Sequence, residues 1–64
     1  MNSYYLLMRC VDGEIASDDR LLNNDSDATL WASYVREGIG SVREWQLYAI
    51  GGAQPRLVTQ GDSR

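Results

Sequence analysis

The N-terminal part of the chain is an apolar run that ends at a turn signal, which predicts a β-hairpin. The segment SYYLLMRCV is rich in aromatic and aliphatic side chains and ends at Asp12-Gly13. An Asp-Gly pair between apolar segments is typical of a tight hairpin turn, because its central residues need positive φ. We therefore expect strands at about 4–11 and 14–17, joined by a turn of two residues.

A two-residue turn also predicts the register of this hairpin. Val11 would face Glu14 and Cys10 would face Ile15, so five residues would share one side of the sheet: Tyr4, Leu6, Met8, Cys10 and Ile15. The second strand would be short and acidic, which suits a sheet edge that must not pair with another chain.

A helix is predicted after the polar stretch 17–24. The segment NNDSD offers several capping residues and places acids in the first helical turn, where the helix dipole favours them. Apolar residues then recur at spacings of three and four: Ala28, Trp31, Tyr34 and Val35, with Leu30 beside them. Gly38-Ile39-Gly40 predicts the helix end, with Gly38 in the left-handed conformation and Ile39 folded back onto the last turn.

The C-terminal part predicts a second hairpin. SVREWQLYAI alternates, with Trp45, Leu47 and Ala49 on one face and Glu44, Gln46, Tyr48 and Ile50 on the other. A loop over 51–55 leads into the strand RLVTQ, and we expect the tail GDSR to be frayed. The whole chain, 1–64, is then a single small α+β domain. It has a three- or four-stranded antiparallel sheet with one helix on one face, in the order β-(β)-α-β-β.

The charge is concentrated in one quarter of the chain. Of the net charge of -3, residues 12–27 contribute six acids and one arginine, whereas the segments on either side are each slightly positive. Such a segment repels nucleic acid and anionic membranes and attracts basic surfaces. Asp12 suits its turn, and Asp25 or Asp27 suits the helix start. Glu14, Asp18 and Asp19 have no evident local role, although they could serve solubility alone.

The residue types give little support to catalysis or metal binding. The chain has no histidine and no lysine, and its single cysteine, Cys10, lies in an apolar strand where we expect an unreactive thiol. Asn23, Asp25 and Asp27 alternate as in a calcium loop, but Ala28 replaces the required glycine and Tyr34 the closing glutamate. We therefore expect no enzymatic activity, no cofactor and no metal site.

Direct binding of nucleic acid is a weaker alternative. Arg9, Arg43 and Arg56 could meet on the sheet, with Tyr5 and Trp45 as stacking platforms. A pI near 4.5 has the wrong sign for a protein that gains affinity by releasing counterions from phosphates. We therefore expect no direct nucleic-acid partner.

The size, the acidity and the acid-loaded hairpin and loop resemble a group of phage proteins. Six acids carry the resemblance as candidate partner-binding residues: Asp12, Glu14, Asp18, Asp19, Asp25 and Asp27. In layout and charge the chain is similar to small phage-borne inhibitors, in particular anti-CRISPR proteins that mimic DNA, and also to phage inhibitors of host RNA polymerase. The resemblance implies a stoichiometric inhibitor that occupies the target-DNA or PAM-reading groove of a host complex, through a basic DNA-binding surface of that complex.

A second hypothesis uses the sheet instead of the acids. In it the chain is a small regulatory or assembly subunit that docks through an aromatic sheet face, and the acids only aid solubility. Exposure of Tyr5, Trp45 and Tyr48 discriminates between the hypotheses, since exposed rings favour docking through the sheet. A lone cysteine fits a reducing compartment, and the sequence has neither a signal-peptide pattern nor an apolar run of membrane-spanning length, so we expect a protein of the host cytosol without membrane contact. We also expect a monomer.

Overall fold

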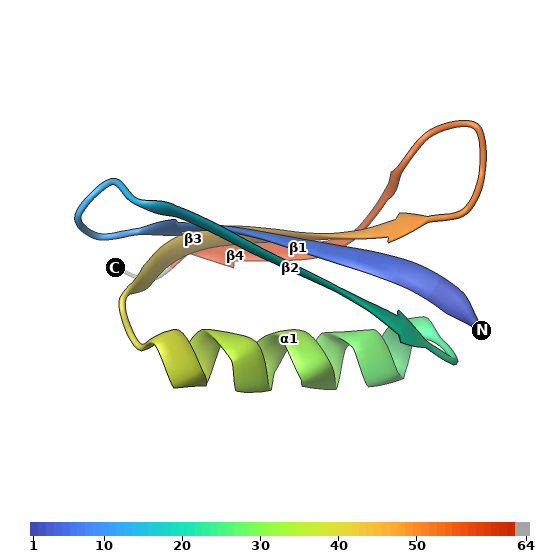
Figure 1. Ribbon diagram of the computed structural model, residues 1–64, viewed down its shortest axis with the longest axis horizontal. Helices are drawn as coiled ribbons and strands as arrows, with labels where there is room; N and C mark the ends of the chain where they lie inside the picture. The colour runs from blue at the N-terminus through green and yellow to red at the C-terminus, as the bar shows by residue number, and fades with distance from the viewer. Residues whose placement is uncertain (63–64) are drawn as a thin grey trace.

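The computed structural model describes residues 1–62, which form one antiparallel sheet and one helix. The elements are β1 (Asn2–Cys10), β2 (Ile15–Leu22), α1 (Asp25–Ile39), β3 (Val42–Ile50) and β4 (Arg56–Asp62). The strands lie in the order β2-β1-β3-β4, and α1 lies along one side of the sheet (Figure 1). The predicted α+β class and element order are confirmed.

The core forms between α1 and the two central strands. Tyr4, Leu6 and Met8 of β1 pair with Ala49, Leu47 and Trp45 of β3, so both strands point the same alternate residues toward the helix. The helix adds small residues and one indole, namely Ala28, Trp31 and Ala32. The alternation predicted for both strands is confirmed, because one face of each strand is buried by α1.

The β1–β2 turn differs from the predicted one. Gly13 has a φ of 89°, but no other residue of the described chain except Gly40 has a positive φ, so Asp12 does not adopt the predicted turn conformation. The amide of Cys10 donates to Glu14 O and the amide of Gly13 donates to Cys10 O, which makes a three-residue loop over 11–13. Arg9 therefore pairs with Ile15, and Ile15 points to the face opposite Cys10. The predicted placement of Ile15 is wrong, because a slip of one residue turns every side chain of a strand over.

The second strand is longer than predicted. β2 continues through Asp18, Asp19 and Arg20 to Leu22, where a polar loop was expected. Its backbone pairs with β1 along nearly the whole length of that strand, from Asn2 opposite Leu22 to Arg9 opposite Ile15. An edge strand tolerates charged side chains because only one of its sides is paired, and the charges discourage pairing on the other side.

The helix begins as predicted but ends two residues later. Asn24 is the N-cap, and its Oδ1 accepts from the amide of Asp27 at 2.8 Å. The left-handed C-cap is Gly40, not Gly38, and its amide donates to Arg36 O at 2.9 Å. Ile39 therefore lies inside the helix and does not fold back onto its last turn.

Two residues named with the predicted apolar helix face are exposed, and Leu30, at 58%, is one of them. Tyr34 is 69% exposed, while Ala32, which was not predicted, is fully buried. The helix lies close to the sheet along a line of small residues, Ala28 and Ala32, with Trp31 beside them. This orientation turns Tyr34 toward solvent.

β4 extends beyond its predicted end and packs on β3 through a glycine. Gly61 and Asp62 belong to the strand, so the predicted fraying is wrong for them, and residues 63–64 of the predicted tail lie outside the described part. Gly61 pairs with Trp45, and a Cβ atom on Gly61 would lie 2.9 Å from Trp45 Cζ2. The guanidinium carbon of Arg36 lies 3.7 Å from the centre of the same indole. Trp45 thus contacts both layers of the fold, and only glycine leaves room for it on β4.

Candidate functional site

The six candidate acids do not come together at one place. Asp12 and Glu14 lie at the β1–β2 turn, whereas Asp25 and Asp27 lie in the first turn of α1. These two places are at opposite ends of the molecule, whose longest extent is 33 Å (Figure 1). Asp18 and Asp19 are neighbours in β2, so their side chains point to opposite faces of the sheet.

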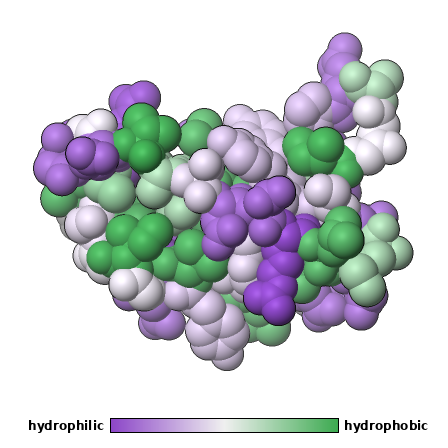
Figure 2. All heavy atoms as spheres, viewed as in Figure 1, coloured by the Kyte–Doolittle hydropathy of each residue, from purple (hydrophilic) through white to green (hydrophobic). Residues whose placement is uncertain are grey.

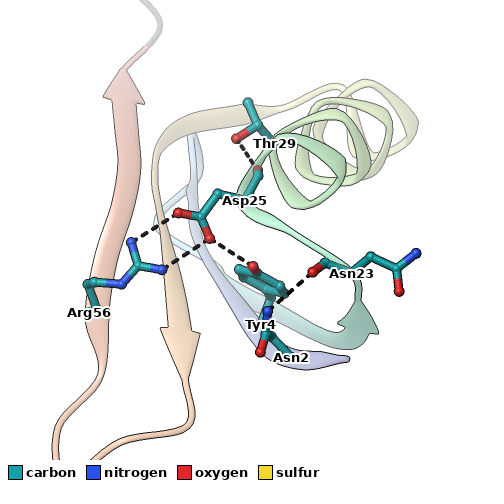
Figure 3. Close-up of polar contacts among 6 residues, drawn as sticks. All are labelled: Asn2, Tyr4, Asn23, Asp25, Thr29 and Arg56. Atoms are coloured by element: carbon teal, nitrogen blue, oxygen red, sulfur yellow. Dashed lines mark hydrogen bonds and ion pairs between the residues drawn. The ribbon is translucent and has the colours of Figure 1, made fainter.

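Asp25 is engaged within the fold. Arg56 of β4 donates through Nη1 to Asp25 Oδ2 and through Nη2 to Asp25 Oδ1, both at 3.0 Å, and the Tyr4 hydroxyl donates to Oδ1 at 2.8 Å (Figure 3). The hydrogen bonds from Arg56 and then from Tyr4 lower the pKa of Asp25. Burial, and next the bond to Asp25, raise the pKa of Tyr4. This carboxylate joins the helix start to β1 and β4, and its side chain stays 46% exposed.

Three further polar contacts of the acids are local. Asp12 Oδ1 accepts from the amide of Glu14 at 3.0 Å, and Asp18 Oδ1 accepts from the amide of Asp19 at 2.8 Å. At the helix start the backbone amide of Asp27 donates to Oδ1 of the N-cap residue Asn24. Among residues 1–62, Glu14, Asp18 and Asp19 have no arginine within ion-pair distance. Four exposed acids of the β1–β2 hairpin thus keep their charge directed to solvent: Asp12, Glu14, Asp18 and Asp19.

The outer edge of β2 carries its charged residues, 18–20, in the middle of the strand. Figure 2, in which this edge faces the viewer, shows hydrophilic side chains gathered over the centre of β2 and hydrophobic ones on either side. The sequence IASDDRLL has the same order, with charged residues 18–20 between aliphatic ends. This composition protects the edge from pairing with another strand.

The side of the sheet opposite α1 is a second distinctive surface, which we call the open face. It is formed by the alternate residues that point away from the helix, and no element of the described chain covers it (Figure 1). The loop over 51–55 rises on this side of the sheet (Figure 1). The residues of the open face are, by strand, Ile15, Ser17, Asp19 and Leu21 of β2; Ser3, Tyr5, Leu7 and Arg9 of β1; Glu44, Gln46, Tyr48 and Ile50 of β3; and Leu57, Gln60 and Asp62 of β4.

The register divides the open face into two halves. In one half Tyr5 lies directly opposite Tyr48, with Leu57 beyond Tyr48 and Ile50 in the next row. Leu57 is 44% exposed and Ile50 is 38% exposed, and both tyrosines are half-buried. This half, together with Leu21, is an apolar and aromatic patch.

The other half of the open face is polar and hollowed. A shallow pocket of about 310 Å³ is lined by residues of β3 and β4: Glu44, Gln46, Gln60, Gly61 and Asp62. A smaller hollow of about 70 Å³ adjoins it at Glu44 and Gln46 and reaches Leu7, Arg9 and Ile15. Arg9 Nη1 lies 3.3 Å from Glu44 Oε1 at the boundary of the two hollows. The pocket wall thus offers carboxylate and amide oxygens.

The three rings that discriminate between the two hypotheses separate in space. Trp45 faces the helix and is partly buried there, whereas Tyr5 and Tyr48 lie on the open face. The sequence pattern contained this signal, since Trp45 and Tyr48 fall on opposite faces of one alternating strand. What the sequence did not indicate is that Ile15 and Leu21 also lie on the open face, Leu21 in the half with the two tyrosines and Ile15 beside Arg9 in the other half.

Two of the three arginines considered for nucleic-acid binding, Arg9 and Arg56, do not meet. Arg9 pairs with Glu44 on the open face, and Arg56 pairs with Asp25 toward the helix. Their guanidinium groups are therefore on opposite sides of the sheet and are already paired with acids. This arrangement gives no shared basic surface for a phosphate backbone.

The described residues show no arrangement typical of a metal or thiol site. Cys10 is buried and 6% exposed, as predicted from its apolar strand. Within residues 1–62 no group of three or more acidic or cysteine side chains is placed to hold a metal ion. The single helix of this part is too short and too polar to cross a membrane.

Comparisons with known proteins found no relatives. The chain matches no protein-family model, no curated protein and no solved structure.

Proposed function

We propose that the protein is a small, non-enzymatic binding protein that docks on a partner protein through the open face of its sheet. One observation carries the proposal: Tyr5, Tyr48 and Leu57 lie side by side on a sheet face that no element of the described chain covers. Contiguous apolar and aromatic patches on small soluble domains are typical of protein interfaces. The protein would then regulate or inhibit its partner by occupying a binding surface of that partner.

A second candidate keeps the acidic hairpin as the binding element. In it the protein is an anti-CRISPR inhibitor that mimics DNA and occupies the target-DNA or PAM-reading groove of a host complex. The supporting observation is that Asp12, Glu14, Asp18 and Asp19 are all exposed within one hairpin. Successive phosphates of one DNA strand advance by roughly 3.4 Å along the helix axis, a rise similar to that of each residue along an extended strand. Asp25 and Asp27 lie at the helix start, away from the hairpin, and Asp25 already accepts hydrogen bonds from Arg56 and Tyr4. We therefore rank this candidate second.

Affinity capture from a lysate of the host organism tests the first candidate against the second. The immobilised parent is compared with Tyr48→Asp and with Tyr34→Asp, a matched control because Tyr34 is exposed on the outer side of α1. We expect the captured partner to be lost with Tyr48→Asp and kept with Tyr34→Asp. Each variant is first checked for folding by circular dichroism.

The same capture includes a charge-reversed hairpin and a DNA competitor. If the partner is lost with the triple variant Glu14→Lys, Asp18→Lys and Asp19→Lys, is displaced by duplex DNA, and is kept with Tyr48→Asp, the DNA-mimic candidate replaces the first. If every variant captures the partner equally, neither surface is the binding site.

A further inference from the structure

We infer that the open face binds a basic protein segment, which places an arginine or lysine side chain in the Glu44 pocket and an apolar side chain on the tyrosine pair. This inference rests on the proposed function and adds the chemistry of the partner. It is carried by the division of one face into an apolar half and a hollowed, acidic half.

The wall of the pocket is built to accept hydrogen bonds from a cation. Glu44 contributes a carboxylate, and Gln46 and Gln60, which pair across β3 and β4, contribute amide oxygens. Guanidinium and ammonium groups are pure donors, and an arginine fork matches a carboxylate in two parallel hydrogen bonds. Glu44 engages Arg9 through Oε1 in a contact of 3.3 Å, which leaves Oε2 for a second cation.

The surrounding charge favours the same occupant. Asp12 and Glu14 are exposed at the end of the sheet where Glu44 lies, and Asp19 lies beside Tyr5 at the edge of the open face. Among residues 1–62, Arg9 and Arg43 are the arginines near this end of the sheet, and Arg9 is already paired with Glu44. A second copy of the chain would bring the same carboxylates into the interface, so complementarity of charge favours a basic partner over self-association.

The two halves are separated by a distance that one polypeptide segment can span. Tyr48 and Glu44 are four residues apart on β3, which corresponds to roughly 13 Å along a strand. A segment that seats an apolar side chain on Tyr5 and Tyr48 can therefore reach Glu44 with an arginine a few residues farther along. Because the apolar and polar halves of the open face differ, they determine which end of the segment lies on the tyrosines and which end lies at Glu44.

Titration followed by nuclear magnetic resonance tests this inference with two synthetic peptides. One peptide carries leucines at one end and arginines at the other, and the second has glutamates in place of the arginines. We expect the arginine peptide to shift amide resonances of Gln46, Tyr48 and Gln60 and to bind at least about tenfold more tightly than the glutamate peptide at low salt.

Charge reversal at matched positions locates the cation. Glu44→Lys should weaken the arginine peptide by at least about tenfold, since like charges then face each other. Glu37→Lys should change its affinity by less than about twofold, because Glu37 is exposed on α1 and the variant has the same net charge. Glu44→Gln serves as a milder second variant if Glu44→Lys does not fold.

The outcomes separate this inference from the proposed function. If both peptides bind the open face equally and only Tyr48→Asp abolishes binding, the docking surface stands and the basic partner is overturned. If the shifts fall on α1 or on the β2 edge, both are overturned. If the protein dimerises through the open face without any peptide, as seen by sedimentation, a second copy is the occupant and the inference is overturned.

Discussion

Leu6 and Leu7 are neighbours in β1, yet they belong to two different surfaces. Leu6 points toward α1 and is fully buried between Leu47 and the helix, whereas Leu7 points to the open face and is only half-buried. The helix-facing side is an ordinary protein core. The open face has a similar content of aromatic and aliphatic residues but no covering layer. The comparison teaches that apolar content alone does not mark a core in a chain of this size, because one helix can cover only one face.

Truncating Leu6 and Leu7 in turn tests whether the two faces differ as a core and an uncovered surface do, and it has the largest expected effect. Leu6→Ala should lower the free energy of unfolding by about 2–5 kcal/mol, because it leaves a cavity in the core. A domain of this size has about 3–5 kcal/mol of stability in total, so the variant should be largely unfolded. Leu7→Ala should cost less than about 1 kcal/mol. Urea unfolding followed by circular dichroism measures both, and equal losses would mean that Leu7 belongs to a second core.

A second test concerns the contact between β4 and the helix-facing side. Gly61→Ala should cost about 1–3 kcal/mol, because the new methyl group would overlap the indole of Trp45, which Arg36 also contacts. Gly52→Ala is the control and should stay within about 0.5 kcal/mol, since a Cβ there meets open space.

A double variant confirms the cause of the Gly61 effect. Trp45→Leu removes the ring, so Gly61→Ala should cost much less in the Trp45→Leu background than in the parent. An unchanged cost in both backgrounds would show that backbone conformation, and not the indole, requires glycine at this position.

The alternation of β1 and β3 was predictable because their two faces differ strongly in burial. The face of the sheet to which each side chain of β2 points was not predictable. An Asp-Gly pair suits both a two-residue turn and the three-residue loop that forms here. That single residue of difference moved Ile15 to the open face. The extension of β2 beyond its predicted end placed Leu21 on the same face and put the neighbours Asp18 and Asp19 on opposite faces. The sequence therefore predicted the fold but not the composition of the candidate surface.

The role of Asp25 was also beyond the reach of sequence patterns. Its position in a first helical turn predicted a capping or dipole role, but its partner Arg56 is 31 residues away along the chain. Only the strand order, which brings the start of β4 close to the helix start, makes this ion pair. Nothing in the local sequence indicated this tertiary contact, and partner binding by Asp25 stays a prediction.

The two ion pairs, one on each side of the sheet, give the smallest and most specific test. Asp25 accepts hydrogen bonds from Arg56 and Tyr4, whereas Glu44 has a single longer contact with Arg9. Asp25→Asn should therefore lower the urea midpoint at neutral pH more than Glu44→Gln does. Because both pairs are exposed, the changes should be modest and should shrink at high salt.

The pH dependence identifies the carboxylate that is responsible. Folding lowers the pKa of Asp25, so this side chain stabilises the native state above its ordinary value of 3.8 and loses that contribution as the pH falls through the lower folded value. The parent should therefore lose stability on acidification more steeply than Asp25→Asn, and the two should converge at the acid end of the titration. If the difference in stability between the parent and Asp25→Asn persists undiminished in acid, the asparagine disturbs packing. The ion pair between α1 and β4 then does not hold the helix-facing side together.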